Sequence, residues 1–176
     1  MSRYYAGIGS RETPPELLAE MVFLGRALSL HGYVLRSGAA EGADTAFEKG
    51  SLNTEAYVPW AKHYQNDGIS NGPVRVINLE ASPYYRAAMD LAAKHHPRWD
   101  KCSSGARKLL ARNGMQILGE PLNSPVEFVV CWTKDGKASG GTGQALRLAQ
   151  HHGIAIYNLR NEDDRLRLQA FVTTFG

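Results

Sequence analysis

Long apolar runs are missing from this 176-residue sequence. No stretch reaches the roughly 18 consecutive apolar residues that a membrane-spanning helix needs. The N-terminus also lacks a basic segment followed by an apolar one, so no secretory signal is predicted. We therefore expect a cytoplasmic protein that has no membrane partner.

Cysteine is scarce, with only Cys102 and Cys131 present. Neither belongs to a CxxC motif or to a Cys/His spacing of a zinc site, which excludes a disulfide framework and structural zinc. The pairs His95-His96 and His151-His152 do not form chelates by themselves, because neighbours on a helix point about 100° apart. The sequence predicts no metal and no cofactor, and a reducing cytoplasm suits it.

A strong excess of one charge is also absent, since the formal net charge is +3 and 21% of residues are charged. No run of Lys and Arg occurs. This balance permits an anionic ligand without requiring nucleic acid, whose binding domains are usually more basic. A hydrophobic content of 43% is typical of a globular protein, and we expect one domain over residues 1–176.

Glycine is grouped in one stretch that resembles an anion-binding loop. Val126–Cys131 is an apolar run typical of a buried strand, and residues 145–150 follow a helical pattern. Between them lie a polar loop that includes Thr133 and the segment 139–144, which is rich in glycine. Glycines let a phosphate approach the backbone, and the first N–H groups of a helix have no partner within it. A tight turn without a ligand would use the same residues.

The pattern of strand, glycine and helix occurs twice more. Residues 4–8 run into Gly9-Ser10-Arg11, and residues 33–36 run into Ser37-Gly38. A helix is expected after each. Ligands of parallel sheets bind beyond the carboxyl ends of the strands, so the three loops are predicted to meet at one crevice.

The order of predicted elements alternates strands with helices, which favours an α/β fold with a parallel sheet and right-handed crossovers. We expect strands at 3–8, 33–37, 56–60, 74–79, 126–131 and 154–159. Helices are expected at 14–30, 43–49, from Ser82 to 95, from Ser103 or Ser104 to 118, at 142–152 and at 162–173.

Several motifs resemble those of the DprA/Smf DNA-processing proteins, and more broadly the superfamily that joins DprA with the LOG phosphoribohydrolases. Gly9-Ser10-Arg11 resembles the first loop of the family. The segment 37–46 resembles its Ser-Gly-x-Ala-x-Gly-x-Asp-x-x-Ala loop, Arg112-Asn113 its Arg-Asn pair, and Ser139-Gly140 with Thr142 its fourth loop. The resemblance implies a Rossmann-like three-layer sandwich with a mostly parallel central sheet. The short form is similar to standalone versions found in bacteriophages.

The LOG loop reads Pro-Gly-Gly-x-Gly-Thr-x-x-Glu, and its glutamate takes part in cleaving a nucleotide N-glycosidic bond. Aligned with that loop, this sequence places Arg147 at the glutamate position. A cation cannot act as the carboxylate does. Glu41 or Asp44 could supply a carboxylate instead, although an Asp at a helix start is more often a cap.

Further candidates have both a functional and a structural interpretation. Arg11 could bind a phosphate or pair with a carboxylate, and Arg112-Asn113 could contact a ligand or anchor a helix. Trp60, Tyr64 and Trp99 could stack on a base or pack in the core. The predicted ligand-binding residues are Gly9, Ser10, Arg11, Ser37, Gly38, Gly42, Asp44, Thr45, Trp60, Arg112, Asn113, Thr133, Ser139, Gly140, Gly141, Thr142, Gly143, Gln144 and Arg147, and none is predicted to be catalytic.

Three functions follow as hypotheses. The first is binding of a phosphorylated nucleotide or nucleotide-derived signal without catalysis, as in sequestration of an immune signal by a phage protein. The second is a DprA-like protein that binds single-stranded DNA in recombination, and the third is a LOG-type nucleoside-monophosphate N-glycosidase. We also expect a homodimer.

Overall fold

The computed structural model describes residues 2–174. Its centre is one sheet of six parallel strands in the order β4-β3-β2-β1-β5-β6. The strands are β1 (Arg3–Gly7), β2 (Tyr33–Ser37), β3 (Thr54–Val58), β4 (Val74–Asn78), β5 (Phe128–Cys131) and β6 (Ala155–Asn158). The chain starts in the middle, builds outward to β4, and then crosses back to place β5 on the other side of β1.

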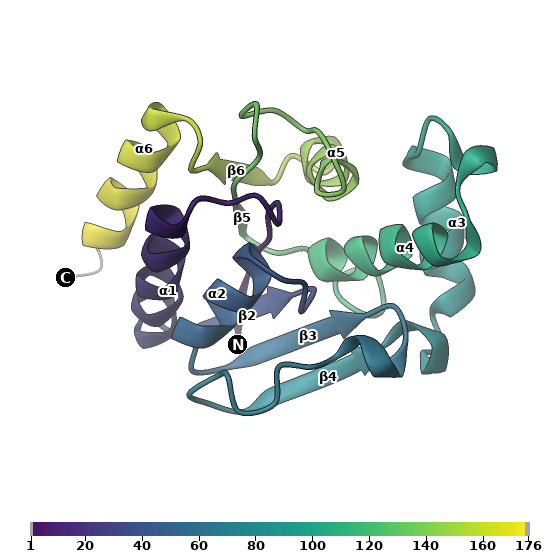
Figure 1. The fold of residues 1–176 in the computed structure, drawn as a ribbon, viewed down its shortest axis with the longest axis horizontal. Coiled ribbons are helices and arrows are strands. Elements are labelled where there is room, and N and C mark those ends of the chain that lie inside the picture. Colours follow the sequence, from purple (N-terminus) through teal and green to yellow (C-terminus); the bar gives the residue numbers. More distant parts are fainter. Residues whose placement is uncertain (1, 175–176) are drawn as a thin grey trace.

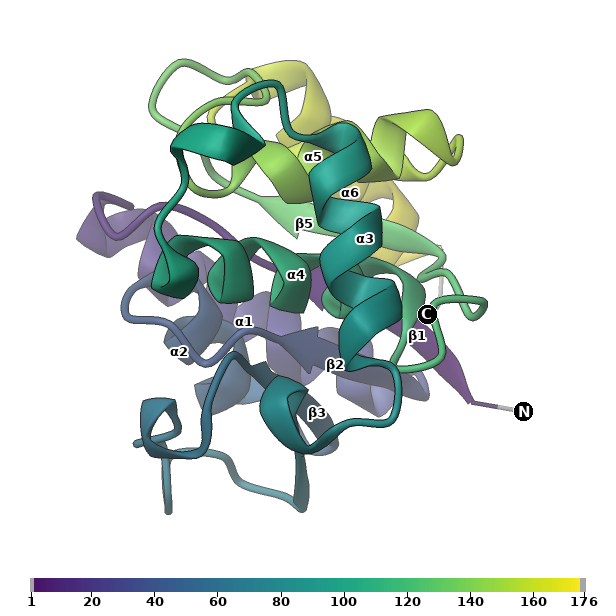
Figure 2. The same cartoon turned by 90° about the vertical axis from the view of Figure 1, so that its right-hand side faces the viewer.

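Helices cover both faces of the sheet, which gives three layers (Figures 1 and 2). One layer holds α1 (Pro15–Leu30), α2 (Ala43–Gly50) and α6 (Glu162–Thr173), and the other holds α3 (Tyr85–His95), α4 (Ser104–Leu118) and α5 (Gly143–His151). Short 3₁₀ turns lie at Ala61–His63, Leu79–Ala81 and Trp99–Lys101. The predicted α/β three-layer fold is confirmed.

Alternation along the strands fills both cores. Tyr5 of β1 packs with α1 and α2, whereas the next residue, Ala6, faces the α4 and α5 side. Tyr5 stacks on Phe128 with ring centroids 5.7 Å apart. On α1, Met21 and Leu28 are fully buried about two turns apart, on the stripe that its helical period predicts.

Two glycines set the distance between α1 and α2. A Cβ atom added to Gly50 would lie 1.9 Å from the carbonyl oxygen of Val22, and one added to Gly25 would lie 2.6 Å from that of Phe47. The two helices therefore cross with their backbones in contact. This close crossing fixes where α2 begins, next to the loop that follows β2.

Two predicted boundaries are wrong. The third strand was predicted at 56–60 but β3 ends at Val58, because Pro59 has no N–H to donate to a strand ladder. Ser82 does not cap α3, since that helix begins at Tyr85. The Ser82 hydroxyl instead donates to Glu120 and accepts the N–H of Tyr84. Ser103 does cap α4, by accepting the N–H of Ala106.

None of the helices in residues 2–174 is both long enough and apolar enough to cross a membrane.

Candidate functional site

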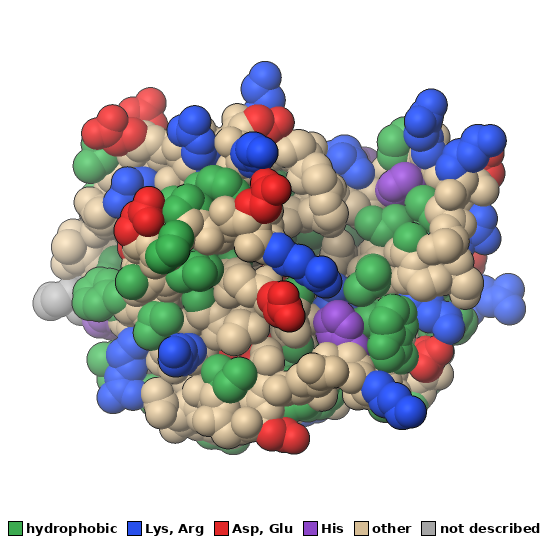
Figure 3. Space-filling view, in the orientation of Figure 1, with side chains coloured by type: hydrophobic (Ala, Val, Ile, Leu, Met, Phe, Trp, Pro, Cys, Tyr) green, Lys and Arg blue, Asp and Glu red, His purple; other side chains and the backbone are tan. Residues whose placement is uncertain are grey.

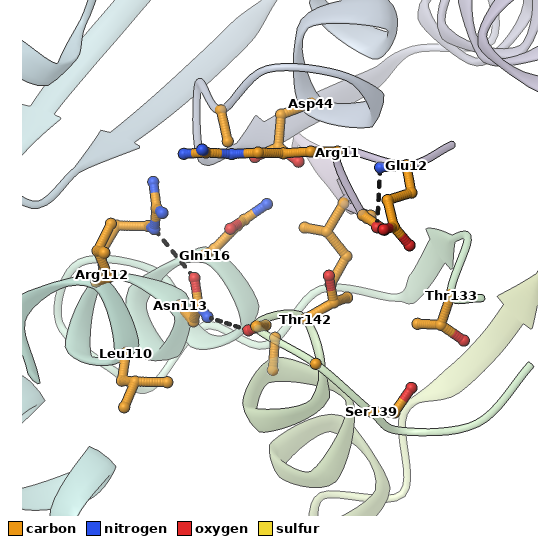
Figure 4. A pocket seen from close by; sticks show the side chains of 18 of the residues that line it. Arg11, Glu12, Asp44, Leu110, Arg112, Asn113, Gln116, Thr133, Ser139 and Thr142 are labelled. Carbon is orange, nitrogen blue, oxygen red and sulfur yellow. Dashed lines mark hydrogen bonds between the residues drawn. The ribbon is translucent and has the colours of Figure 1, made fainter. Parts of the chain in front are cut away.

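A cavity of about 860 Å³ opens at the carboxyl ends of β1 and β5. These strands are adjacent, and the chain leaves them toward opposite sides of the sheet, so their loops separate and create a crevice. The loops after β1, β2 and β5 form part of the wall, and one side of α4 forms much of the rest (Figure 4). The three loops that the sequence predicts to converge do contribute to one site.

The loop after β1 presents a cation without a partner. The Ser10 N–H donates to the carbonyl of Trp132 in the loop after β5, and the Ser10 hydroxyl accepts the N–H of Glu12. Arg11 is exposed, and within residues 2–174 it makes no hydrogen bond or ion pair. The guanidinium is therefore free to bind an anion.

The loop after β2 is organised by Asp44. Its carboxylate accepts the N–H of Gly38 at 2.9 Å, and Gly42 before α2 adopts a φ of +89°, which favours glycine. Burial raises the pKa of Asp44 to about 7, although the positive charge of Arg112 opposes this shift. Asp44 therefore holds the loop in place while it also lines the cavity.

Arg112 and Asn113 connect two of the loops across α4. Arg112 is buried and donates through Nη1 to the carbonyl oxygens of Gly38 and Tyr57, and through Nε to Oδ1 of Asn113. The Nδ2 group of Asn113 then donates to the carbonyl oxygen of Gly141 at 3.3 Å (Figure 4). A continuous series of hydrogen bonds thus joins the ends of β2 and β3 to the glycine loop after β5.

The glycine loop offers backbone donors at the start of α5. Gly140 has a φ of +65°, and a Cβ atom added there or at Gly141 would meet nothing within 4 Å. In the described part of the chain, the N–H groups of Gly140, Gly141 and Thr142 have no hydrogen-bond partner. Gly143 differs, since its N–H donates to the carbonyl of Gly140.

Hydroxyl groups near this loop already have partners. The Ser139 hydroxyl donates to Asp135 at 2.7 Å, and the Thr133 hydroxyl donates to the carbonyl of Lys137 at 2.8 Å. Both bonds brace the loop between β5 and α5. The polar part of the site is therefore built mainly from backbone N–H groups and Arg11.

An apolar wall, which the sequence-based prediction missed, faces the glycine loop. Leu109 and Leu110 of α4 line the cavity together with Ala106 and Ala145. Cys102 and His96 complete this side, with Sγ 3.8 Å from Nδ1 of the imidazole. The period of α4 did not reveal this wall, because Leu109 and Leu110 fit the pattern of residues that face a sheet.

Eleven of the nineteen predicted binding residues line the cavity: Gly9, Ser10, Arg11, Asp44, Arg112, Asn113, Thr133, Ser139, Gly140, Gly141 and Thr142. Ligand binding by them remains a prediction. Cavity-lining residues that were not predicted include Ile8, Glu12, Gln116, Lys134 and Asp135. A scan for strand ends and glycine loops would find all of these except Gln116, which lies inside α4.

The other eight predicted residues lie outside the lining, and a role for them in binding likewise remains a prediction. They are Ser37, Gly38, Gly42, Thr45, Trp60, Gly143, Gln144 and Arg147. Thr45 donates to the carbonyl of Ala40, Trp60 packs edge-on against His63, and Gln144 donates to the carbonyl of Ala92. Arg147 donates to Gln144 at 3.1 Å.

The surrounding charge is mixed. The face drawn in Figure 3 carries acidic and basic side chains interspersed. Among residues 2–174, no three His, Cys, Asp or Glu side chains are placed to hold a metal ion.

The comparisons with known proteins give one informative match. Neither a family model nor a curated protein matches the sequence. The structure of DNA processing protein A (DprA) from Helicobacter pylori, described for its single-stranded DNA binding mode, matches with a TM-score of 0.60 and 19% sequence identity. The match covers 98% of this chain and 80% of that one. At this level of identity the match establishes the fold, which is DprA-like.

Proposed function

We propose that this protein binds single-stranded DNA and takes one nucleotide unit into the cavity. The observation that carries the proposal is the pairing of free anion donors with an apolar wall inside one pocket. A nucleotide has the same two parts, a phosphate and a flat base. The nucleotide binds without a catalytic step in this proposal.

The phosphate is assigned to the side formed by Arg11 and the glycine loop. Arg11 has no competing carboxylate partner among the described residues, and Arg112 adds a second positive charge nearby. Both arginines lie at the same pocket (Figure 4). Burial lowers the pKa of His63, and the positive charges of Arg112 and Arg11 lower it further. The unpaired N–H groups at the start of α5 complete a donor set suited to a phosphate oxygen.

The base is assigned to the side formed by Leu109, Leu110 and Ala145. Burying a base against these side chains removes apolar surface from water and is tolerant of sequence. The amide nitrogen of Gln116 is already used, since it donates to the carbonyl oxygens of Gly7 and Arg36. We therefore expect weak discrimination among bases.

The DprA structure favours DNA as the ligand, since that protein was described for its single-stranded DNA binding. The sequence alone placed a free phosphorylated nucleotide first. The cavity volume of about 860 Å³ keeps that second candidate open, because it falls in the range of pockets that enclose a small molecule. The two candidates differ in whether the affinity grows with the length of the strand.

The test measures binding of a fluorescent 20-nucleotide oligothymidine and of thymidine 5′-monophosphate (dTMP) to wild type, Arg11→Ala and Arg26→Ala. Arg26 is a matched control, an exposed arginine on α1 that, among residues 2–174, makes no hydrogen bond or ion pair. We expect Arg11→Ala to weaken oligonucleotide binding by roughly tenfold or more, the value of one charge-assisted contact. The slope of log affinity against log salt should fall by about 0.7 for the lost phosphate contact.

Equal losses in the Arg11 and Arg26 variants would contradict the assignment of Arg11. If dTMP binds as tightly as the oligonucleotide, the free nucleotide is the ligand and the DNA proposal fails. Absence of binding to either ligand would exclude both candidates.

A further inference from the structure

We propose that the side-chain oxygen of Gln116 accepts a hydrogen bond from an N–H group of the base that enters the cavity. The inference rests on the proposed function, because it names the group of the nucleotide that the same cavity recognises. Gln116, which was not among the residues predicted from the sequence, thereby becomes a residue that determines specificity.

The sheet fixes the orientation of the Gln116 amide. Its Nε2 atom lies 3.5 Å from the carbonyl oxygen of Gly7, which ends β1, and 3.3 Å from that of Arg36 in β2. A carbonyl oxygen only accepts hydrogen bonds, so the amide nitrogen must face these two groups. The Oε1 atom is therefore held on the other side of the amide, away from the strands.

The Oε1 atom of this buried side chain is free. Gln116 is only 1% exposed, and within residues 2–174 no hydrogen bond reaches Oε1. Solvent still reaches the oxygen, because the fully enclosed side-chain atoms that lack a partner in this part of the chain belong to six other residues: Tyr5, Glu48, Thr54, His63, Arg147 and Arg165. Since Gln116 lines the cavity, the route to Oε1 runs through the cavity.

The position of this acceptor suits the base of a nucleotide and not its phosphate, because a carbonyl oxygen repels a phosphate oxygen. In Figure 4 the Gln116 side chain lies at the centre of the view, with Arg11 above it and Thr142 below it. Leu110 and Ala145, which are assigned to the face of the base, line the same cavity. A base that packs on these two side chains turns its polar edge to the Gln116 oxygen.

Binding makes the free oxygen a test of the ligand. A base that enters the cavity displaces the water around Oε1, so it must donate a hydrogen bond or leave a buried acceptor unpaired. Sites of this kind reject an analogue that lacks the donor more strongly than an apolar pocket rejects a small change of shape. Every DNA base carries an N–H or NH₂ group on its Watson–Crick edge, where bases are commonly recognised. The acceptor therefore requires a donor while it discriminates weakly among the four bases.

The sharpest test keeps the shape of the base and removes its N–H group. Thymine in a nucleotide has one N–H group, at N3, and 2,4-difluorotoluene has nearly the same outline with a C–H group in that place. Each base is measured as the 5′-monophosphate and as a 20-nucleotide strand. We expect wild type to bind the thymine ligands roughly tenfold more tightly, the value of a hydrogen bond whose loss leaves a buried acceptor unpaired. A pocket without an acceptor gives the reverse order, because difluorotoluene is the more apolar base.

The variant Gln116→Met separates recognition from a structural role, since methionine has a similar length and no amide. The thymine preference should disappear in this variant. If Gln116 only supported the sheet, the substitution would weaken binding of both bases by the same factor and the preference would remain. Gln150→Met is the matched control, because Gln150 is an exposed residue of α5 outside the cavity lining, and it should keep the wild-type preference.

Nuclear magnetic resonance gives a second measurement. The imino proton at N3 of free dTMP exchanges rapidly with water, and a hydrogen bond to Oε1 should protect it. Its resonance should therefore appear when dTMP binds to wild type or to Gln150→Met, and it should be absent with Gln116→Met.

Equal or tighter binding of the difluorotoluene ligands by wild type would overturn the inference and leave the proposed function intact. A thymine preference that persists in Gln116→Met would overturn it as well. If Gln116→Met does not fold, the order of the two affinities in wild type decides alone. If wild type binds neither dTMP nor oligothymidine, the proposed function fails and this inference fails with it.

Discussion

Asp44 is the residue whose ionisation is most closely tied to the site. Its pKa is raised from 3.8 to about 7 by burial. Between about pH 4 and pH 7 the Asp44 carboxyl group has lost its proton in the unfolded chain but still holds it in the folded chain. The contribution of Asp44 to the free energy of unfolding therefore decreases as the pH rises from about 4 to 7, by up to about 1.4 kcal/mol per pH unit, and then levels off.

We predict that Asp44→Asn removes most of this decrease, because an amide does not titrate. Chemical denaturation at pH 4, 5.5, 7 and 8 measures the slope. Asp67→Asn is the control, since Asp67 is exposed and has no hydrogen bond among the described residues. A slope in Asp44→Asn equal to that of the control would contradict the raised pKa.

Individual residues also show why part of the site could not be predicted from the sequence. The predicted strand ends and glycine loops correctly indicated that Arg11, Asp44 and Gly140 line the cavity. The direction in which a side chain leaves a helix depends on its partners, and Arg147 turns to Gln144. No sequence pattern shows that the carbonyl of Gly141 is held by Asn113.

At the level of elements, the crossing of α1 and α2 restricts which residues can stand at the contact. Overpacking at a contact between backbones costs more than at a flexible side chain, because neither helix can yield alone. The Val22 carbonyl at Gly50 is such a contact. Since Gly42 precedes α2 and Asp44 lies in its first turn, a displacement of this helix would also reach the cavity.

We predict that Gly50→Ala lowers the free energy of unfolding by about 2 kcal/mol or more. Gly105→Ala provides the control, since a Cβ there meets nothing within 4 Å and alanine favours a helix. Thermal and urea unfolding compare the two variants. An unchanged stability for Gly50→Ala would show that α1 and α2 can separate without cost.

At this scale the sequence was informative about which elements exist and less so about their ends. Periodicity located six strands and six long helices near their observed positions. The strand predicted at 56–60 ends early because of Pro59. The predicted cap at Ser82 is wrong because the Ser82 hydroxyl forms a tertiary hydrogen bond to Glu120 instead. Element type follows from the period of burial, whereas boundaries follow from partners distant in sequence.

For the whole molecule, assembly remains a prediction, and we expect a homodimer. Phe23 on α1 and Leu166 on α6 are 67% and 56% exposed on the same layer of helices. Glu20 and Arg165 join these helices through an ion pair of 2.9 Å. Large apolar side chains exposed on a shared surface favour association.

Light scattering at micromolar concentration should give twice the chain mass of 19.3 kDa. Replacing both Phe23 and Leu166 with Ser should shift the mass to that of one chain, whereas Tyr84→Ser on the other layer should not. A wild-type mass of about one chain would exclude the dimer.

The strand order has a consequence for how the protein is made. The central strand β1 leaves the ribosome well before its neighbour β5, which begins only at Phe128. Until then one edge of β1 has no strand to pair with, and the glycine loop of residues 139–143 does not yet exist. Translation proceeds at about 5–20 residues per second, so the nascent chain spends several seconds with this edge open. The complete cavity can therefore bind a ligand only after the glycine loop is synthesised, and the ligand cannot help the segments before β5 to fold.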